Sequence, residues 1–115
     1  MLEIECTRYR VQQGKSEKVT EWLKFLNDNM KDVLVTLEGE KMYVETIFRE
    51  VWNNEEYLYW YAVQGTGGNA VEDSTHWIDK KHIDYWDECI DPTFIPVNLS
   101  TEVVMIPEKI KVNMI

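Results

Sequence analysis

The strongest hydrophobic pattern in the chain lies at residues 42–64, where two apolar segments flank the pair Asn53-Asn54. Both segments are rich in β-branched and aromatic residues, which favour extended strands. Asparagine tolerates a positive φ, so the pair suits a two-residue type I′ turn. The pattern therefore predicts a β-hairpin in which Trp52 pairs with Glu55. Apolar side chains then occur on both faces of the hairpin, so each face needs a cover.

The segments before this hairpin predict one strand and one long helix. Residues 2–11 alternate apolar with polar side chains, which is the period of a strand. Apolar residues recur at helical spacing over residues 15–38, including the strand-like run 33–36, so we expect one continuous helix. Ser16 is the expected N-cap of this helix, and Gly39 is the glycine expected after its last turn.

The segments after the hairpin predict a second helix and a final strand. The glycine-rich loop 65–69 leads to an amphipathic helix, which starts either within that loop or near Ser74 and ends before Pro92. Residues 101–106 (TEVVMI) then predict the last strand. Residues 107–115 form either a short further strand or an arm that reaches a partner.

The order of these elements is βαββαβ, which predicts a ferredoxin-like α+β fold. Such a fold has a four-stranded antiparallel sheet with two helices on one face, and we expect residues 1–115 to form it as a single domain. The other face, which carries aromatic side chains, stays uncovered in a monomer. Two-fold pairing is the commonest way to cover such a face, so we expect a homodimer.

The net charge of -9 bears mainly on the choice of partners. Nucleic acids and anionic lipids attract basic proteins, so we expect neither as a partner. No apolar run approaches the ~20 residues that a membrane span needs. The N-terminus lacks the character of a signal peptide, so we expect a cytoplasmic protein. Cys6 and Cys89 are expected to be reduced, buried thiols.

Four residues are candidates for a ligand site: Arg49, Trp60, His82 and Tyr85. Arg49 would hold an anionic or enolate oxygen, in an ion pair with Glu45 beside the indole of Trp60. His82 would shuttle a proton, because imidazole has a near-neutral pKa. The alternatives are that His82 is a core histidine bonded to a neighbour and that Arg49 belongs to a structural ion pair.

The remaining motifs give weaker indications. The ladder Tyr57, Tyr59 and Tyr61 could stack on an aromatic ligand or pack in an interface. The loop 65–69 lacks the lysine and the spacing of a phosphate-binding loop, so it predicts a flexible connection or a lid. The two histidines face different ways on a helix and no Cys or His cluster exists, so we expect neither a metal nor a cofactor.

Element order and length resemble the dimeric α+β barrel superfamily, which includes antibiotic-biosynthesis and haem-degrading monooxygenases. More closely, the runs GKSEKVTEWLKFLNDNM, TLEGEKMYVETIFRE, EYLYWYAVQG and DKKHIDYWDECID resemble a small bacterial family of unknown function. Haem degradation is disfavoured, because Thr7 and Arg8 occupy the stretch of the first strand where haem-degrading relatives carry an asparagine. The histidines of the second helix also precede its tryptophans, which is the reverse of the order in those relatives.

The sequence and its resemblance leave two functions open. The first is a cofactor-free monooxygenase-like or small-molecule-binding protein, with a small aromatic or anionic ligand between sheet and helices. The alternative is a non-catalytic homodimeric interaction module, in which the aromatic face of the sheet serves dimerisation alone. A cavity with converging polar groups would favour the first function, whereas solid packing would favour the second. The sequence leaves open whether the protein is an enzyme.

Overall fold

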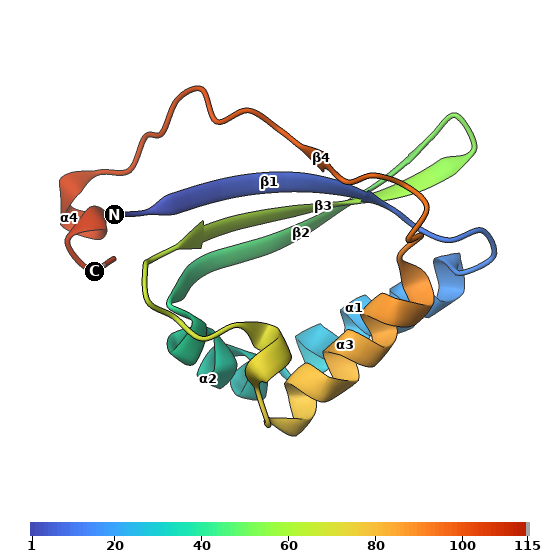
Figure 1. The fold of residues 1–115 in the computed structure, drawn as a ribbon, viewed down its shortest axis with the longest axis horizontal. Helices are drawn as coiled ribbons and strands as arrows, with labels where there is room; N and C mark the ends of the chain where they lie inside the picture. The colour runs from blue at the N-terminus through green and yellow to red at the C-terminus, as the bar shows by residue number, and fades with distance from the viewer. Residues whose placement is uncertain (115) are drawn as a thin grey trace.

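The computed structural model describes residues 1–114, which form a four-stranded antiparallel sheet with helices packed against one face (Figure 1). The strands are β1 (Glu3–Arg10), β2 (Met42–Trp52), β3 (Glu55–Gln64) and β4 (Val97–Asn98). Their order in the sheet is β2-β3-β1-β4. This is the arrangement of a ferredoxin-like α+β fold, as the element order predicted.

The hairpin of β2 and β3 has the predicted turn and register. Asn53 and Asn54 have φ values of 52° and 61°, as a type I′ turn requires. Trp52 pairs with Glu55, and the pairing continues in step until a β-bulge between Met42 and Val44. Both the turn residues and the alternation of the two arms are therefore consistent with one register, which the structure adopts.

The prediction of one continuous first helix is wrong. The segment forms two helices, α1 (Ser16–Asp28) and α2 (Met30–Glu40), separated by Asn29. The side-chain amide of Asn29 donates to the carbonyl of Phe25 at 2.8 Å, and this local bond competes with regular helix geometry. Figure 1 shows α1 alongside α3 and α2 beneath the opposite end of the sheet. The prediction that residues 33–36 are helical is confirmed.

The predictions of both capping residues of this helical segment are also wrong. Ser16 is the first helical residue, and its hydroxyl donates to Glu56 at 2.6 Å instead of capping the helix. Gly39 lies inside the last turn of α2, whose last helical residue is Glu40. The C-cap is Lys41, which has a left-handed backbone conformation (φ 54°). The backbone N–H of Lys41 satisfies the carbonyls of the last turn, so the helix needs no glycine there.

The second predicted helix, α3 (Trp77–Cys89), takes the later of the two predicted starts. A short 3-10 helix, η1 (Val71–Asp73), precedes it. The N-cap is His76, whose Nδ1 accepts a hydrogen bond from the N–H of Ile78 at 3.2 Å. An imidazole thus performs the capping role that Ser74 was expected to fill.

The predicted last strand at residues 101–106 is wrong. The fourth strand is the two-residue β4, which pairs with Thr7 and Arg8 of β1. Residues 101–106 run on without sheet pairing, and Figure 1 shows them arching away before the short helix α4 (Glu108–Lys111). Strand propensity reflects burial on a pleated surface, and the side chains of this segment are mostly exposed here. The final residue of the predicted arm, Ile115, lies outside the described residues.

The core lies between the helices and one face of the sheet. Trp22 of α1 is fully buried and its ring lies near those of Trp60 and Trp86, at 5.7 and 6.0 Å between centroids. Cys6 and Cys89 are both free thiols, and Cys89 is fully buried. Within residues 1–114, no helix combines the length and the apolar character that crossing a membrane requires.

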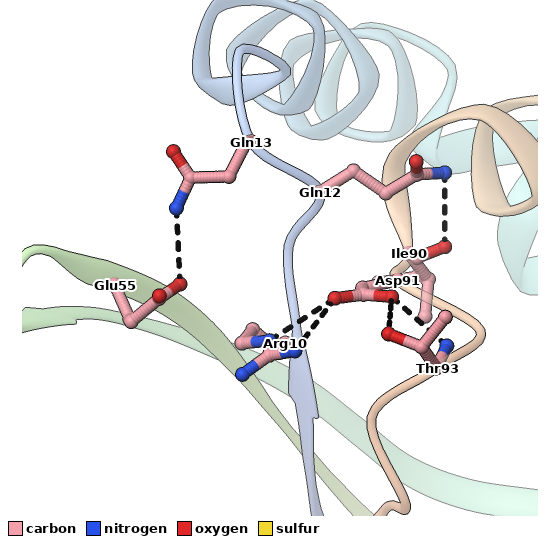
Figure 2. Close-up of polar contacts among 7 residues, drawn as sticks. All are labelled: Arg10, Gln12, Gln13, Glu55, Ile90, Asp91 and Thr93. Atoms are coloured by element: carbon pink, nitrogen blue, oxygen red, sulfur yellow. Dashed lines mark hydrogen bonds and ion pairs between the residues drawn. The ribbon is translucent and has the colours of Figure 1, made fainter.

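A polar network joins the end of β1 to the segment that follows α3 (Figure 2). Nε and Nη2 of Arg10 donate to the carboxylate of Asp91 at 3.1 and 2.9 Å. The same carboxylate accepts bonds from the backbone and hydroxyl of Thr93, and these bonds, followed by the ion pair, lower the pKa of Asp91. Gln12 donates to the carbonyl of Ile90 at 3.2 Å. The network fastens the end of α3 to the sheet, which is a structural role.

Candidate functional site

A cavity of about 380 Å³ lies between the sheet and the junction of α1 with α2. Aliphatic side chains form most of its wall, with Leu23 and Leu26 from α1, Leu37 from α2 and Ile47 from β2. Side chains from both sides of the helix break at Asn29 contribute to the wall, so the break shapes the cavity. We refer to this space as the aliphatic cavity.

Glu45 is one of the polar groups in this mostly apolar wall. The indole N–H of Trp60 donates to its carboxylate at 2.5 Å. Burial raises the pKa of Glu45, the hydrogen bond from Trp60 lowers it, and the charge of Asp79 raises it further. Because burial dominates, Glu45 holds a proton more readily than an ordinary glutamate does.

His82 lies on the helical side of the same cavity. The indole N–H of Trp22 donates to its Nδ1 at 3.0 Å, so the ring proton of the neutral imidazole is on Nε2. Burial lowers the pKa of His82, and the charge of Asp79 opposes this effect. The imidazole is therefore neutral at physiological pH and fixed in one tautomer. His82 was expected either to be a core histidine bonded to a neighbour or to belong to a ligand site. In the structure it is bonded to Trp22 in the core and also lines the cavity.

Glu40 lies at the end of α2, between the aliphatic cavity and a second, more open cavity of about 500 Å³. Burial raises its pKa to about 7, and the nearby carboxyl groups of Asp79, Glu45 and Glu72 add to the shift. We refer to the second space as the polar cavity, because Asp73, Ser74 and other polar residues form most of its wall. Glu40 is thus a group that titrates near neutral pH at the boundary between two cavities.

Asp79 lines the polar cavity from the first turn of α3. Its side chain is only 6% exposed, and Oδ2 is buried without a hydrogen-bond partner among residues 1–114. A buried carboxylate oxygen without a donor costs free energy, so it marks a place where a donor or a cation would bind favourably.

The glycine-rich loop packs against the end of α2. The N–H of Asn69 donates to the carbonyl of Gly39 at 2.9 Å. A Cβ on Gly68 would lie 2.1 Å from the carbonyl oxygen of Glu40, so only glycine allows this approach. The loop, which was expected to be a flexible connection or a lid, forms part of the wall of the polar cavity.

The structure brings together two of the four candidate ligand residues, Trp60 and His82, whose rings lie 5.6 Å apart in the aliphatic cavity. Tyr85 lies elsewhere in the core, where its ring stacks on Trp22 and its hydroxyl donates to Glu21 at 2.8 Å. Tyr85 therefore supports the cavity wall through Trp22 and does not line it.

Arg49 also lies outside the aliphatic cavity. It donates to Glu56 of β3 at 3.0 Å and to Thr20 and Ser16 of α1 at 2.8 to 3.0 Å. The predicted ion pair with Glu45 does not form, because the guanidinium finds these acceptors at the start of α1. Glu45 keeps the predicted neighbour Trp60 as its donor instead.

The tyrosine ladder lies on the sheet face that points away from the helices. The ring of Tyr57 packs against Phe94 at 5.9 Å, with the guanidinium of Arg8 5.0 Å from its centroid. The hydroxyl of Tyr59 donates to Glu50 at 2.7 Å. The ladder is therefore remote from the aliphatic cavity, which argues for packing.

Sequence reasoning overlooked Glu40 and Asp79. Asp79 carried a usable signal, because it stands three residues before His82 and so shares its side of the helix. The sequence carried no such signal for Glu40, since its raised pKa depends on burial and on carboxyl groups from other elements. Within residues 1–114, no cluster of three or more His, Cys, Asp or Glu side chains is arranged to hold a metal ion.

Comparisons with known proteins show the fold of the chain and its family. A family profile described as "Family of unknown function (DUF6176)" matches residues 2–112, whereas no curated protein matches the chain. Among solved structures, the L-rhamnose mutarotase from Formosa agariphila is similar, with a TM-score of 0.52 and 18% identity over 92% of this chain and 99% of that one. At this identity the likeness shows the fold alone. It confirms the predicted ferredoxin-like α+β architecture.

Proposed function

We propose that this chain, which belongs to the DUF6176 family of unknown function, binds a small molecule in its aliphatic cavity. One observation carries the proposal: Glu40, Glu45 and His82 line a cavity whose other residues are mostly aliphatic. Protein interiors normally pack as densely as organic crystals. An interaction module without a ligand would fill this space with side chains.

The polar groups of the cavity are held in defined orientations. Trp60 fixes the carboxylate of Glu45, and Trp22 fixes the imidazole of His82. A few oriented polar groups in an apolar cavity are typical of small-molecule sites. The ligand would place an apolar body against the aliphatic wall and a polar group against the carboxyls. Because these groups are acidic, an anionic ligand fits poorly, although the sequence suggested one.

The same groups are suited to proton transfer. The pKa of Glu40 is raised to about 7, and neutral His82 carries a lowered pKa. Cofactor-free oxygenation, suggested by the superfamily resemblance, and mutarotation, named for the similar structure, both require a proton donor and an acceptor. If the protein is an enzyme, it therefore catalyses proton transfer on the bound molecule. If it is not, it binds the molecule without changing it.

A thermal-shift screen of small aromatic and aliphatic molecules tests the proposal. We expect a ligand to raise the melting temperature of the wild-type protein and to lose this effect in Glu45→Gln and in His82→Ala. The control Glu17→Gln removes the charge of an exposed carboxyl on α1 and should keep the full shift. Absence of any shift across a broad screen would contradict a small-molecule site.

We further propose that the protein is a homodimer with the helix-free sheet face as its interface. On this face Phe48 and Trp52 are 56% and 66% exposed. In the C-terminal segment, Val103 and Met105 are 71% and 86% exposed. Extended apolar surface of this kind is unusual on a monomer, and a second copy of the chain would cover it symmetrically.

A further inference from the structure

We propose that the ligand of the aliphatic cavity is an amine: an apolar body that carries an ammonium group, with the ammonium bound between Glu40 and Asp79. This inference rests on the proposed small-molecule site and specifies the chemical class of its ligand. The apolar body would occupy the aliphatic cavity, and the ammonium would reach the boundary with the polar cavity, where Glu40 lies.

Three carboxyl groups from three different elements line the two cavities: Glu40 lines both, Glu45 the aliphatic cavity and Asp79 the polar cavity. Glu40 comes from the end of α2, Glu45 from β2 and Asp79 from the start of α3. Within residues 1–114, none of the three forms an ion pair with a lysine, an arginine or a histidine. The fold therefore gathers acidic groups here, and the part of the chain that the structure describes pairs none of them with a cationic side chain.

Asp79 provides an independent indication of a ligand. Its side chain is more than nine-tenths buried, and its Oδ2 lacks a donor in the described part of the chain. Buried carboxylates in folded proteins are normally paired or hydrogen-bonded, because desolvation without a partner is costly. An ammonium group has three N–H donors and a positive charge, so it satisfies this oxygen and also balances Glu40.

A neutral or anionic polar group fits this place less well. A hydroxyl group can donate only one hydrogen bond and balances no charge. A carboxylate or phosphate would meet like charge and would raise the cost of ionising Glu40 further. The net charge of -9 also favours the approach of a cation over that of an anion.

Binding of an ammonium should release a proton from Glu40. Its pKa of about 7 in the free protein reflects burial together with the carboxyls of Asp79, Glu45 and Glu72, which face it from α3, β2 and η1. His82 is neutral at this pH and adds no positive charge. The charge of a bound cation favours the ionised form of Glu40 and so lowers its pKa, and the amine should therefore bind more tightly as the pH rises from 6 to 8.

Isothermal titration calorimetry on the full-length protein with three matched probes tests the proposal. The probes are 4-phenylbutylamine, 4-phenylbutanol and 4-phenylbutanoate, which share a body and differ in head group. We expect the amine to bind at least tenfold more tightly than the alcohol and the carboxylate to bind more weakly than either. Titrations in phosphate and in Tris, which differ in ionisation enthalpy, should show release of a proton on binding of the amine at pH 7.

Isosteric variants separate the charge from the shape of the site. Asp79→Asn and Glu40→Gln should each weaken the binding of the amine about tenfold and change that of the alcohol by less than twofold. The control Asp84→Asn removes an exposed charge from the same helix as Asp79 and should leave both affinities unchanged. Equal binding of amine and alcohol, or an amine affinity that neither variant changes, overturns the inference but leaves the small-molecule site intact. If no probe binds and the thermal-shift screen also finds no ligand, both the amine and the small-molecule site are overturned.

Discussion

The indole nitrogen of Trp22 donates a 3.0 Å hydrogen bond to Nδ1 of His82 and thereby joins α1 to α3 at the wall of the aliphatic cavity. Trp22 is also fully buried and packs within 6.0 Å, between ring centroids, of Trp60 and Trp86. One side chain therefore belongs to the aromatic core and orients a group of the candidate site. The stability of the fold and the geometry of the site depend on the same residue.

Replacing Trp22 with Phe should destabilise the protein by about 2 to 4 kcal/mol, because it removes buried volume and leaves Nδ1 of His82 without its donor. Urea unfolding monitored by circular dichroism measures the change. Trp77 is 52% exposed, so the control Trp77→Phe should change the free energy of unfolding by less than about 0.5 kcal/mol. Equal effects of the two substitutions would show that Trp22 has no special role.

Glu40 should make the protein less stable as the pH rises through 7. Its pKa is raised from 4.5 to about 7 in the folded protein, so the folded state binds more protons than the unfolded state between these values. Its stabilising contribution is therefore complete below pH 4.5 and is lost as the pH rises through 7.

The variant Glu40→Gln should match the wild type at pH 5 and exceed its free energy of unfolding by about 1 kcal/mol at pH 8, since partial exposure screens much of the shift. Chemical denaturation at the two pH values measures this difference. The control Asp84→Asn removes an exposed carboxyl that lines neither cavity and should change the free energy of unfolding by less than about 0.5 kcal/mol. A constant difference between Glu40→Gln and the wild type at both pH values would contradict the raised pKa.

His82 should show the opposite dependence on pH. Burial lowers its pKa below the ordinary value of 6.5, so the unfolded state binds the proton first as the pH falls. The contribution of the neutral imidazole is present above pH 6.5 and is lost as the pH falls below it. An NMR titration of the Cε1 proton of His82 should give a midpoint below 6.5. A midpoint at or above that value would mean that the ring is not held neutral.

Two glycines near the polar cavity should respond oppositely to alanine. Gly68→Ala should destabilise the protein by about 1 to 3 kcal/mol, because its Cβ would lie 2.1 Å from the backbone oxygen of Glu40. Gly39 lies within α2 and a Cβ there would meet only Asn69, at 3.6 Å, so Gly39→Ala should stabilise the protein by about 0.5 to 1 kcal/mol. Thermal unfolding of both variants measures the contrast. A neutral Gly68→Ala would show that the loop is not held against α2.

The helix-free sheet face should control the oligomeric state. Phe48→Glu should convert the proposed dimer into a monomer of 13.7 kDa, because a carboxylate in the centre of an apolar interface stays unpaired. Sedimentation velocity at micromolar concentration measures the mass. The control Val35→Glu alters an exposed apolar side chain on the helical side and should remain dimeric. A monomeric wild-type protein would contradict the proposed interface.

Much of the fold could be predicted because its determinants are local. The turn at Asn53-Asn54 follows from the tolerance of asparagine for a positive φ, and the alternation of the flanking arms sets the register. Periodicity correctly overruled strand propensity at residues 33–36. It could not reveal the break at Asn29, because the apolar stripe continues across the break, and the side-chain bond of Asn29 to Phe25 leaves no mark in the hydrophobic pattern.

Only half of the candidate ligand residues could be predicted from the sequence alone. Hydrophobic periodicity placed His82 on the apolar stripe of its helix, and strand register placed Trp60 on the same sheet face as Glu45, so these positions follow from local geometry. Arg49 bonds to Glu56 on the neighbouring strand and to acceptors on α1. Glu40 lies near Asp79 only because α2 packs close to the start of α3. The sequence by itself thus determined which side chains share one face of a strand or helix, since that depends on periods of 2 and 3.6 residues. The tertiary structure decided which of them meet, since residues from separate elements converge only when those elements pack together.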